Sequence, residues 1–251
     1  MARMCRPLAC LAAAIFVIAR FAAAEPVDLE LALAADGSGS IDTEELQLQR
    51  DGYADAIGHP AVLRAIRSGQ IGAIAVSYIE WGGPASQHTI VDWAVIRDAQ
   101  SAEAFAERLR DRPRQAIGYN SISNVLYYAA GKILSNAHEG TRKVIDLSGD
   151  GPQIGGRPLA VVRAETIAAG ITINAIAIKS PGGAISGPGG MPLPEHYRRD
   201  VIGGPGAFMM VAEDRRHFRE AILQKMLLEI AWALPSPARL AAAGALPAAP
   251  K

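Results

Sequence analysis

Oxygen-bearing side chains gather in the stretch AADGSGSIDTEEL, residues 34–46. Asp36, Ser38 and Ser40 alternate with glycines, so their side chains can converge in a tight turn. A second aspartate, Asp150, follows the apolar run RKVIDLS. Two carboxylates and two hydroxyls are hard oxygen ligands that suit Mg²⁺ or a similar cation. The residue types therefore predict a divalent-cation site, provided that the fold brings the two segments together.

The same stretch also matches much of an EF-hand calcium loop. Asp36, Ser38, Gly39 and Glu45 fall on expected loop positions, but Ala34 stands at the first position and has no oxygen to give. The preceding residues VDLELALAA alternate as a strand does, whereas an EF-hand loop follows a helix. We therefore favour a strand, a turn and a helix, in which Asp42 is the N-cap and Glu45 closes a capping box.

The elements that must position these residues alternate along the chain. Strands are predicted at 27–35, 71–81, 88–96, 142–148, 171–178 and 208–212, and helices at 42–58, 61–67, 101–110, 121–134, 157–170 and 215–234. This alternation predicts an α/β fold with a Rossmann-like, doubly wound, mostly parallel sheet flanked by helices. Such sheets bind ligands at the carboxyl ends of their strands. The DGSGS turn, the GDG sequence at 149–151 and a glycine/proline loop at 180–196 all follow strands, and IGYNSIS (117–123) is expected to add a further oxygen.

Taken together, these segments resemble the von Willebrand factor type A (vWA) domain superfamily. The resemblance covers residues 27–232 and is carried by VDLELALAADGSGSID, AIAVSYIEW, RKVIDLSGDG, GITINAIAI and VIGGPGAF. It is closest to an exported bacterial vWA-like family of unknown function. The resemblance implies a metal-ion-dependent adhesion site (MIDAS) whose ligands are Asp36, Ser38, Ser40, Asn120, Ser121 and Asp150.

Two positions depart from the superfamily pattern. Asn120 stands where the mid-chain ligand is usually a threonine, with Ser121 next to it, and Gly149 stands where a threonine often precedes the later aspartate. The resemblance implies that Mg²⁺, Mn²⁺ or Ca²⁺ is held directly by the serines and largely through water by the aspartates. One coordination position then stays open for an Asp or Glu of a partner protein, and the protein acts as a binding module rather than an enzyme.

Two alternatives remain open. A haloacid-dehalogenase-like, Mg²⁺-dependent phosphatase would use Asp36 as nucleophile and Asp150 in its metal loop, but its general acid belongs two residues after the nucleophile, where Ser38 stands. Alternatively, the domain is a metal-free structural or interaction module in which both aspartates only hydrogen-bond turns and cap helices.

The five histidines show no metal-ligand spacing and are expected on the surface or in loops. Trp81 is expected to pack in the core or at the rim.

The chain ends indicate export. Residues 1–24 have a basic start, an apolar stretch and a small-residue cleavage site, as a secretory signal peptide has. Residues 25–234 form the predicted domain, and the Ala/Pro-rich tail 235–251 is expected to be disordered. Cys5 and Cys10 both lie in the signal, which excludes disulfides from the exported chain. The exported chain is mildly acidic, with no expected nucleic-acid partner or membrane span, and is predicted to be periplasmic or secreted.

Overall fold

The computed structural model of the chain describes residues 24–179, 184, 186–213 and 218–231. The predicted tail and all but the last residue of the predicted signal peptide lie outside these residues. No helix in the described part of the chain is long and apolar enough to cross a membrane.

A six-stranded sheet in the order β4-β3-β2-β6-β7-β8 forms the centre of the molecule. Its strands are β2 (Leu29–Asp36), β3 (Ile74–Trp81), β4 (Gln87–Ile96), β6 (Lys143–Gly149), β7 (Ile171–Ile178) and β8 (Met209–Ala212). All neighbouring strands pair in parallel except β4, which pairs antiparallel with β3 at one edge. The prediction of a doubly wound, mostly parallel sheet is confirmed.

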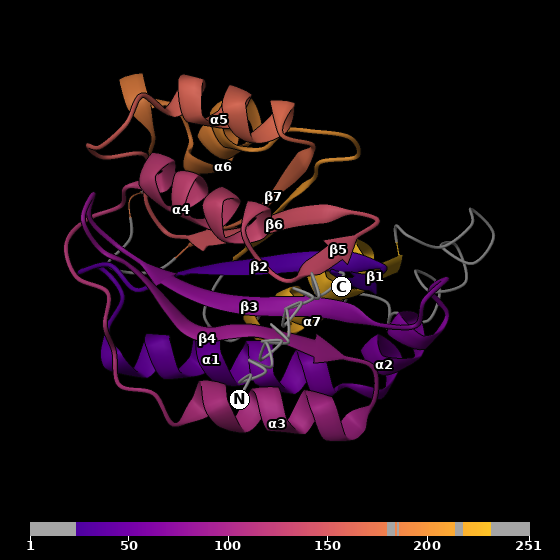
Figure 1. Cartoon of the computed structure of the whole chain (residues 1–251). Helices are drawn as coiled ribbons and strands as arrows, with labels where there is room; N and C mark the ends of the chain where they lie inside the picture. The colour runs from indigo at the N-terminus through magenta and orange to yellow at the C-terminus, as the bar shows by residue number, and fades with distance from the viewer. Residues whose placement is uncertain (1–23, 180–183, 185, 214–217, 232–251) are drawn as a thin grey trace, which may run out of the picture.

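Helices cover both faces of this sheet (Figure 1). One face carries α1 (Thr43–Gly58), α2 (Pro60–Arg67), α3 (Ala99–Arg110) and α7 (Phe218–Ala231), and the other carries α4 (Ile122–Leu134), α5 (Leu159–Ala168) and α6 (Leu193–His196). Side chains of β2 alternate between the two cores: Leu31 and Leu33 pack with the first group of helices, Ala32 and Ala34 with the second. Because both faces are covered, β2 is buried along its whole length.

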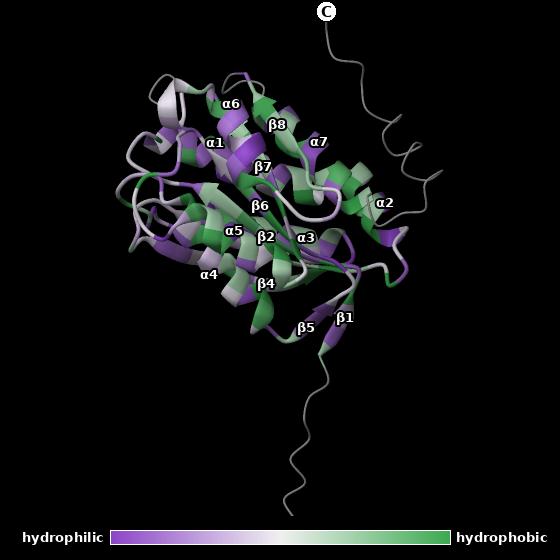
Figure 2. Cartoon of the chain, turned by 90° about the horizontal axis from the view of Figure 1, so that it is seen from above, coloured by the Kyte–Doolittle hydropathy of each residue, from purple (hydrophilic) through white to green (hydrophobic). Residues whose placement is uncertain are grey.

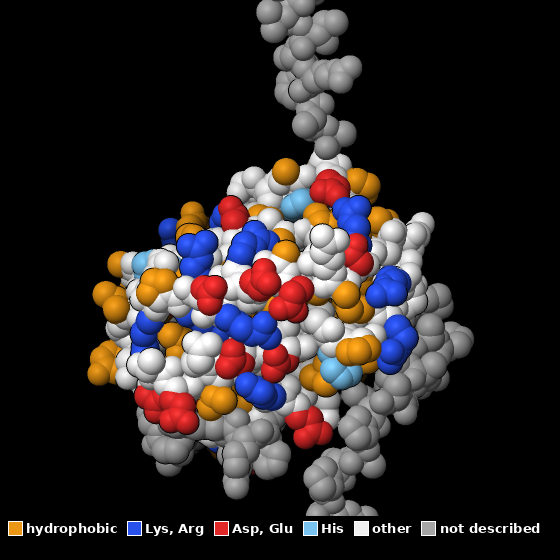
Figure 3. Space-filling model, turned by 90° about the horizontal axis from the view of Figure 1, so that it is seen from below, with side chains coloured by type: hydrophobic (Ala, Val, Ile, Leu, Met, Phe, Trp, Pro, Cys, Tyr) orange, Lys and Arg blue, Asp and Glu red, His pale blue; other side chains and the backbone are white. Residues whose placement is uncertain are grey.

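The distribution of polarity follows from these layers. In Figure 2 the central strands are largely hydrophobic, while the helices alternate between apolar and polar residues. Figure 3 shows charged side chains of both signs on the face that bears α1 and α3. There Arg110 of α3 forms ion pairs with Asp51 and Asp55 of α1, and Arg219 of α7 also pairs with both aspartates. This face is therefore a solvated, charge-balanced surface.

The start of α1 decides between the two interpretations of the DGSGS stretch. Asp42 is the N-cap: its Oδ1 accepts from Glu45 N at 2.8 Å, and its own N–H donates to Glu45 Oε2 at 2.9 Å. The element before the turn is the strand β2 and not a helix. The EF-hand arrangement is thus excluded, and the predicted capping box is confirmed.

Short elements differ from the sequence expectation. The strands β1 (Glu25–Val27) and β5 (His138–Gly140) pair in parallel as a separate two-stranded sheet beside the amino ends of β2 and β6. The loop predicted at 180–196 contains α6, which continues into a π-helix at Tyr197–Val201. Strands of three residues carry too little periodicity to be predicted, and the prolines around residue 193 concealed a helix that begins with Pro194 in its first turn.

Candidate metal site at the carboxyl ends of β2 and β6

The sheet register brings the two oxygen-rich segments together. Strands β2 and β6 are parallel neighbours in which Ala35 pairs with Ser148, so Asp36 and Asp150 leave the same edge of the sheet side by side. The backbone N–H of Asp150 donates to Asp36 Oδ2 at 3.4 Å. The two segments therefore meet, as the predicted cation site requires, because β2 and β6 are neighbours in the sheet.

Four side chains form a connected set at this edge. Ser38 N donates to Asp36 Oδ1 at 2.7 Å, which closes a tight turn at the end of β2. The Ser38 and Ser40 hydroxyl oxygens lie 3.1 Å apart, and Ser40 Oγ donates to Asp150 Oδ1 at 2.8 Å. Asp36, Ser38 and Asp150 are fully buried. The candidate metal site is hereafter the set Asp36, Ser38, Ser40, Asn120 and Asp150.

The mid-chain residues occupy two different places. Asn120, just before α4, donates from Nδ2 to Asp36 Oδ2 at 2.7 Å. Ser121 N donates to Gly82 O at 2.8 Å, and its hydroxyl donates to Gly155 O at 3.2 Å. The structure thus brings Asn120 into contact with the carboxylate of Asp36, while the Ser121 side chain is hydrogen-bonded to the loop after Asp150.

Electrostatics within the site disfavour two ionised carboxylates. Burial, followed by the negative charge of Asp150, raises the pKa of Asp36 to about 7, although hydrogen bonds from Ser38 and Asp150 act in the opposite direction. Two carboxylates in one low-dielectric site repel each other, and a divalent cation between them would remove this repulsion.

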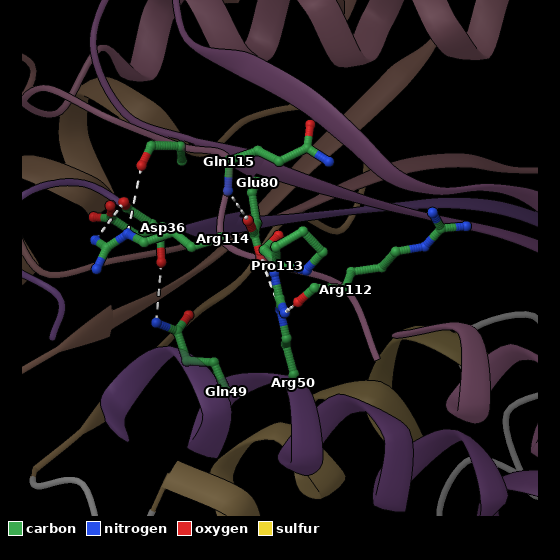
Figure 4. A network of polar contacts seen from close by, with 10 residues as sticks. Asp36, Gln49, Arg50, Glu80, Arg112, Pro113, Arg114 and Gln115 are labelled. Carbon is green, nitrogen blue, oxygen red and sulfur yellow. Dashed lines mark hydrogen bonds and ion pairs between the residues drawn. The ribbon is translucent and has the colours of Figure 1, made fainter. Parts of the chain in front are cut away.

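A second layer of polar contacts holds the turn from below (Figure 4). Gln49 of α1 donates to Asp36 O at 3.0 Å, and Arg114 Nη2 donates to the carbonyl oxygens of Gly37 and Ser38 at 2.7 and 2.5 Å. Arg50 of α1 forms a buried ion pair with Glu80 of β3 at 2.5 Å. Arg50 also donates to the carbonyl oxygens of Arg112 and Pro113, so the segment that carries Arg114 is fixed against the sheet.

Tyr197 is a neighbour of the site that sequence analysis missed. Its hydroxyl donates to Gly151 O at 2.9 Å, and burial together with the charges of Asp36 and Asp150 raises its pKa well above the usual value. A Cβ on Gly149 would lie 2.6 Å from this hydroxyl, and a Cβ on Gly151 would lie 2.8 Å from the Asn120 amide. The two glycines around Asp150 therefore make room for Tyr197 and Asn120. The lack of a side chain at Gly149 is a signal in the sequence from which a bulky neighbour could have been inferred.

The donor set fits a hard divalent cation. A serine hydroxyl has two lone pairs, so Ser40 can donate its proton to Asp150 and still ligate an ion. The carboxylate oxygens likewise keep lone pairs beyond the hydrogen bonds they accept. No group of three or more His, Cys, Asp or Glu side chains capable of holding a metal occurs within the described residues, so a cation here would depend on the serines as well as the two aspartates. Asn120 presents its amide nitrogen to Asp36 and supports the carboxylate in this arrangement.

Two expectations about other side chains are tested directly. Trp81 is fully buried and its indole N–H donates to Ala34 O at 3.1 Å, so it belongs to the core. His196 was expected on the surface or in a loop, which is wrong: it is buried in α6, with Nδ1 2.8 Å from Asp200 Oδ2 and Nε2 accepting from Gln153 N at 3.3 Å. The undetected helix α6 accounts for the error.

The position required for a phosphatase acid is occupied by Ser38. Its backbone N–H and hydroxyl belong to the hydrogen-bonded set of the candidate metal site, and it has no carboxyl group to protonate a leaving group. The local chemistry thus favours cation binding over an aspartyl-phosphate route.

Comparison with solved structures places the fold. Proximal thread matrix protein 1 from the mussel byssus, in a structure with a zinc-occupied MIDAS motif, matches with a TM-score of 0.61 at 16% identity, over 83% of this chain and 49% of that one. The pilus adhesin SpaC from Lactobacillus rhamnosus GG matches with a TM-score of 0.58 at 14% identity, over 83% of this chain and 31% of that one. The SpRpn10 VWA domain matches with a TM-score of 0.55 at 12% identity, over 79% of this chain and 95% of that one.

The fold is therefore that of a vWA domain, which confirms the resemblance found in the sequence. The chain belongs to the family described as "Protein of unknown function (DUF1194)", whose model matches residues 26–234. No curated protein sequence matches the chain. The chain spans about a third of the length of the SpaC structure and about half of the mussel protein. At these identities the likeness concerns the fold alone.

Proposed function

We propose that this protein is an exported binding module that holds one divalent cation at the candidate metal site and binds a carboxylate of a partner protein through it. The ion is Mg²⁺, or Mn²⁺ or Ca²⁺ in its place. The proposal includes export through the signal peptide predicted at residues 1–24 and no catalytic step.

The observation that carries the proposal is the hydrogen-bonded set of Asp36, Ser38, Ser40 and Asp150 at adjacent strand ends. These oxygens come from two segments far apart in the sequence. The turn after β2 is held by hydrogen bonds from Gln49 of α1, to the Trp81 carbonyl of β3, and from Arg114. Such support from outside the ligand set is typical of sites that must keep a fixed geometry for a ligand. The zinc-occupied MIDAS motif of the mussel protein supports the same use of this fold.

Charge is the reason why the ion would recruit an external acid. Two aspartates supply two negative charges at most, and the serine hydroxyls supply none. Where the aspartates act through water, the direct ligands leave the cation under-neutralised, and a partner carboxylate at an open position completes the charge and the coordination. The affinity for the partner should therefore depend on the metal.

Calorimetric titration of the purified protein with Mg²⁺, Mn²⁺ and Ca²⁺ tests the metal step. We expect binding of one ion per chain, abolished by Asp36→Ala and weakened by Ser40→Ala. Asp55→Ala is the matched control, because Asp55 lies on α1 in surface ion pairs with Arg110 and Arg219. Equal binding by wild type and Asp36→Ala would refute the assigned site, and failure of all three ions to bind wild type would refute the proposal.

Capture of periplasmic or surface proteins on immobilised wild type then tests the partner step. We expect retained proteins to be released by EDTA and to be absent from an Asp36→Ala matrix. Partners that remain bound under both conditions would show that binding does not pass through the cation.

A further inference from the structure

Exposed apolar side chains stand around the candidate metal site. Ile117 is 72% exposed and Tyr119 is 66% exposed, both on the loop that leads to Asn120, and Ile154 is 47% exposed on the loop after Asp150. Pro84, exposed on the β3–β4 loop, lies beside this second loop: a Cβ on Gly155 would be 3.5 Å from Pro84 Cγ. These four residues are hereafter the apolar rim.

Hydrogen bonds join the loops of the apolar rim into one surface. Gly83 N donates to Ile117 O at 2.8 Å, and Ile154 N donates to Asn120 O at 2.6 Å. Asn124 Nδ2 donates to Pro84 O at 2.6 Å, and Gly39 N, inside the metal-binding turn, donates to Gly118 O at 2.8 Å. The three loops are thus tied to one another and to the candidate metal site, which makes the surface pre-organised for binding.

Tyr119 stands next to the turn itself. A Cβ on Gly39 would lie 3.7 Å from Tyr119 Cε1, which is ordinary van der Waals contact, so the ring borders the segment between Ser38 and Ser40. A residue adjacent to an acid bound at the cation would therefore lie within reach of this ring. Single exposed apolar residues are common on protein surfaces, but a group of them on linked loops around one site is typical of an interaction surface.

The charges of the same loops point to an acidic partner. The three loops, 82–86, 111–124 and 151–157, contain Arg112, Arg114 and Arg157 against a single acid, Asp111, which directly follows α3. The Arg157 guanidinium lies 3.7 Å from the centre of the ring of Tyr127, a residue of α4, and this contact holds the arginine against that helix. Three acids follow the turn along the chain, and they belong to the start of α1: Asp42, Glu44 and Glu45.

From these observations we infer that the apolar rim is the recognition surface for a partner segment in which one Asp or Glu, the metal ligand, is flanked by apolar residues. The inference rests on the proposed function, because the acid must reach the cation. The apolar side chains add contact area and specificity that the cation alone cannot supply, since any carboxylate can ligate a metal. The arginines add long-range attraction for an acidic segment.

Selection from random peptides tests this inference without knowledge of the natural partner. Phage-displayed linear peptides are panned on the immobilised protein in Mg²⁺ and, in parallel, in EDTA. We expect peptides enriched only in Mg²⁺ to share an Asp or Glu with an aliphatic or aromatic residue within one or two positions. A synthetic peptide of the enriched sequence is then titrated against variants of the protein.

The variant Ile117→Ser/Tyr119→Ser is expected to bind this peptide about tenfold more weakly or worse, because two exposed contacts of the interface are lost. Ile71→Ser is the matched control: Ile71 is 45% exposed but lies before β3, at the amino end of the strands. Peptide binding by the control should equal that of wild type.

Metal titration of the same proteins separates this inference from the proposed function. We expect the rim variant to bind Mg²⁺ as wild type does. If wild type binds no divalent cation, the proposed function fails and the inference falls with it. If wild type binds the cation, the inference alone is overturned by any of three results: no Mg²⁺-dependent enrichment, enriched acids without apolar neighbours, or undiminished peptide binding by the rim variant.

Discussion

At the scale of single residues, Asp36 links the candidate metal site to pH. Its carboxyl group has an ordinary pKa of 3.8 and a pKa of about 7 in the metal-free fold, because it is buried beside Asp150. Between these two pKa values the folded state keeps the proton on Asp36, whereas the unfolded state has lost it. The contribution of Asp36 therefore favours the metal-free fold at low pH and is lost as the pH rises from about 4 to about 7.

A divalent cation should reverse this dependence. Since the ion binds the ionised carboxylate and must displace its proton, we expect saturating Mg²⁺ to raise the melting temperature more at about pH 8 than at about pH 5.5. Differential scanning fluorimetry with Mg²⁺ and with EDTA measures the shift in melting temperature at each pH. Asp36→Asn should abolish the Mg²⁺ response at both values. Equal shifts in wild type at the two pH values would contradict the assignment of the titrating group.

The space beside Gly149 is occupied by the Tyr197 hydroxyl, and substitutions at the two positions test this contact together. Gly149→Ala should destabilise the protein by about 1–3 kcal/mol, because the added Cβ meets the Tyr197 hydroxyl at 2.6 Å. In the Tyr197→Phe background this hydroxyl is gone, and the cost of the same alanine should be smaller. Urea unfolding of the two single variants and the double variant gives the coupling energy. Strictly additive costs would mean that the hydroxyl is not what excludes the side chain.

The oxygen-bearing residues of the candidate metal site were predictable from sequence, whereas their neighbours were not. Spacing alone brought out Asp36, Ser38 and Ser40, because oxygen-bearing side chains that alternate with glycine after an apolar strand are typical of a ligand-binding turn. Tyr197 lies 46 residues beyond the Gly151 carbonyl that it contacts, and no local pattern encodes that contact. Similarly, nothing in the sequence says that the Ser121 hydroxyl bonds to Gly155 while Asn120 bonds to Asp36.

At the scale of elements, α7 is attached to the sheet by buried charges as well as by apolar packing. Lys225 of α7 is fully buried and donates to Asp146 of β6 and, at 2.6 Å, to Glu229 one turn further along the helix. Asn174 of β7 also donates to Glu229, at 3.2 Å. Burial and the charge of Asp146 raise the pKa of Glu229 to about 7, while Lys225 acts against this rise.

Removal of the buried ammonium group should be costly and pH-dependent. We expect Lys225→Met to destabilise the protein by about 3–5 kcal/mol, because two carboxylates are left buried without their positive partner. The loss should be greater at about pH 8 than at about pH 5, since protonation of Glu229, whose pKa is raised to about 7, relieves its repulsion with Asp146. Chemical denaturation at both values measures it.

A compensated variant provides the control for this experiment. Lys225→Met combined with Asp146→Asn and Glu229→Gln should recover part of the lost stability, because no uncompensated charge remains. If the single variant is as stable as wild type at both pH values, then the buried ion cluster does not hold α7.

The long elements were predictable for a physical reason. Strands buried on both faces read as largely apolar runs, as in ITINAIAI (171–178), and helices between them carry their own periodicity and caps. The three-residue pair β1 and β5 is formed by tertiary contact, with Glu25, Pro26 and Val27 opposite residues more than a hundred positions away. Helix α6 was hidden because glycine and proline dominate the preceding residues.

At the scale of the whole molecule, the candidate metal site joins parts that the chain separates widely. It connects β2, β6 and the start of α4, so an ion bound there would stabilise the complete sheet rather than one loop. We expect a single cooperative unfolding transition that Mg²⁺ shifts upward as a unit. A ligand at a hundredfold excess over its dissociation constant adds about 2.7 kcal/mol.

For a domain of this size that stabilisation corresponds to a rise in melting temperature of roughly 5–10 °C. Calorimetric melting at several Mg²⁺ concentrations measures it, with Asp55→Ala as the variant that should respond like wild type. Two resolved transitions, of which only one moves with Mg²⁺, would show instead that the site stabilises a local segment.

The small β1–β5 sheet has a consequence for orientation. It lies at the amino ends of β2 and β6, which Figure 1 shows at one end of the central sheet, whereas the candidate metal site lies at the carboxyl ends. Helix α7 finishes at the same end as β1, because Arg142, at the start of β6, donates to Glu229 O near the end of α7. Residue 24 and residue 231 therefore emerge from the pole opposite the site. A tether, carrier or sensor surface joined at either point would therefore leave the candidate metal site at the far end of the domain, facing away from the attachment.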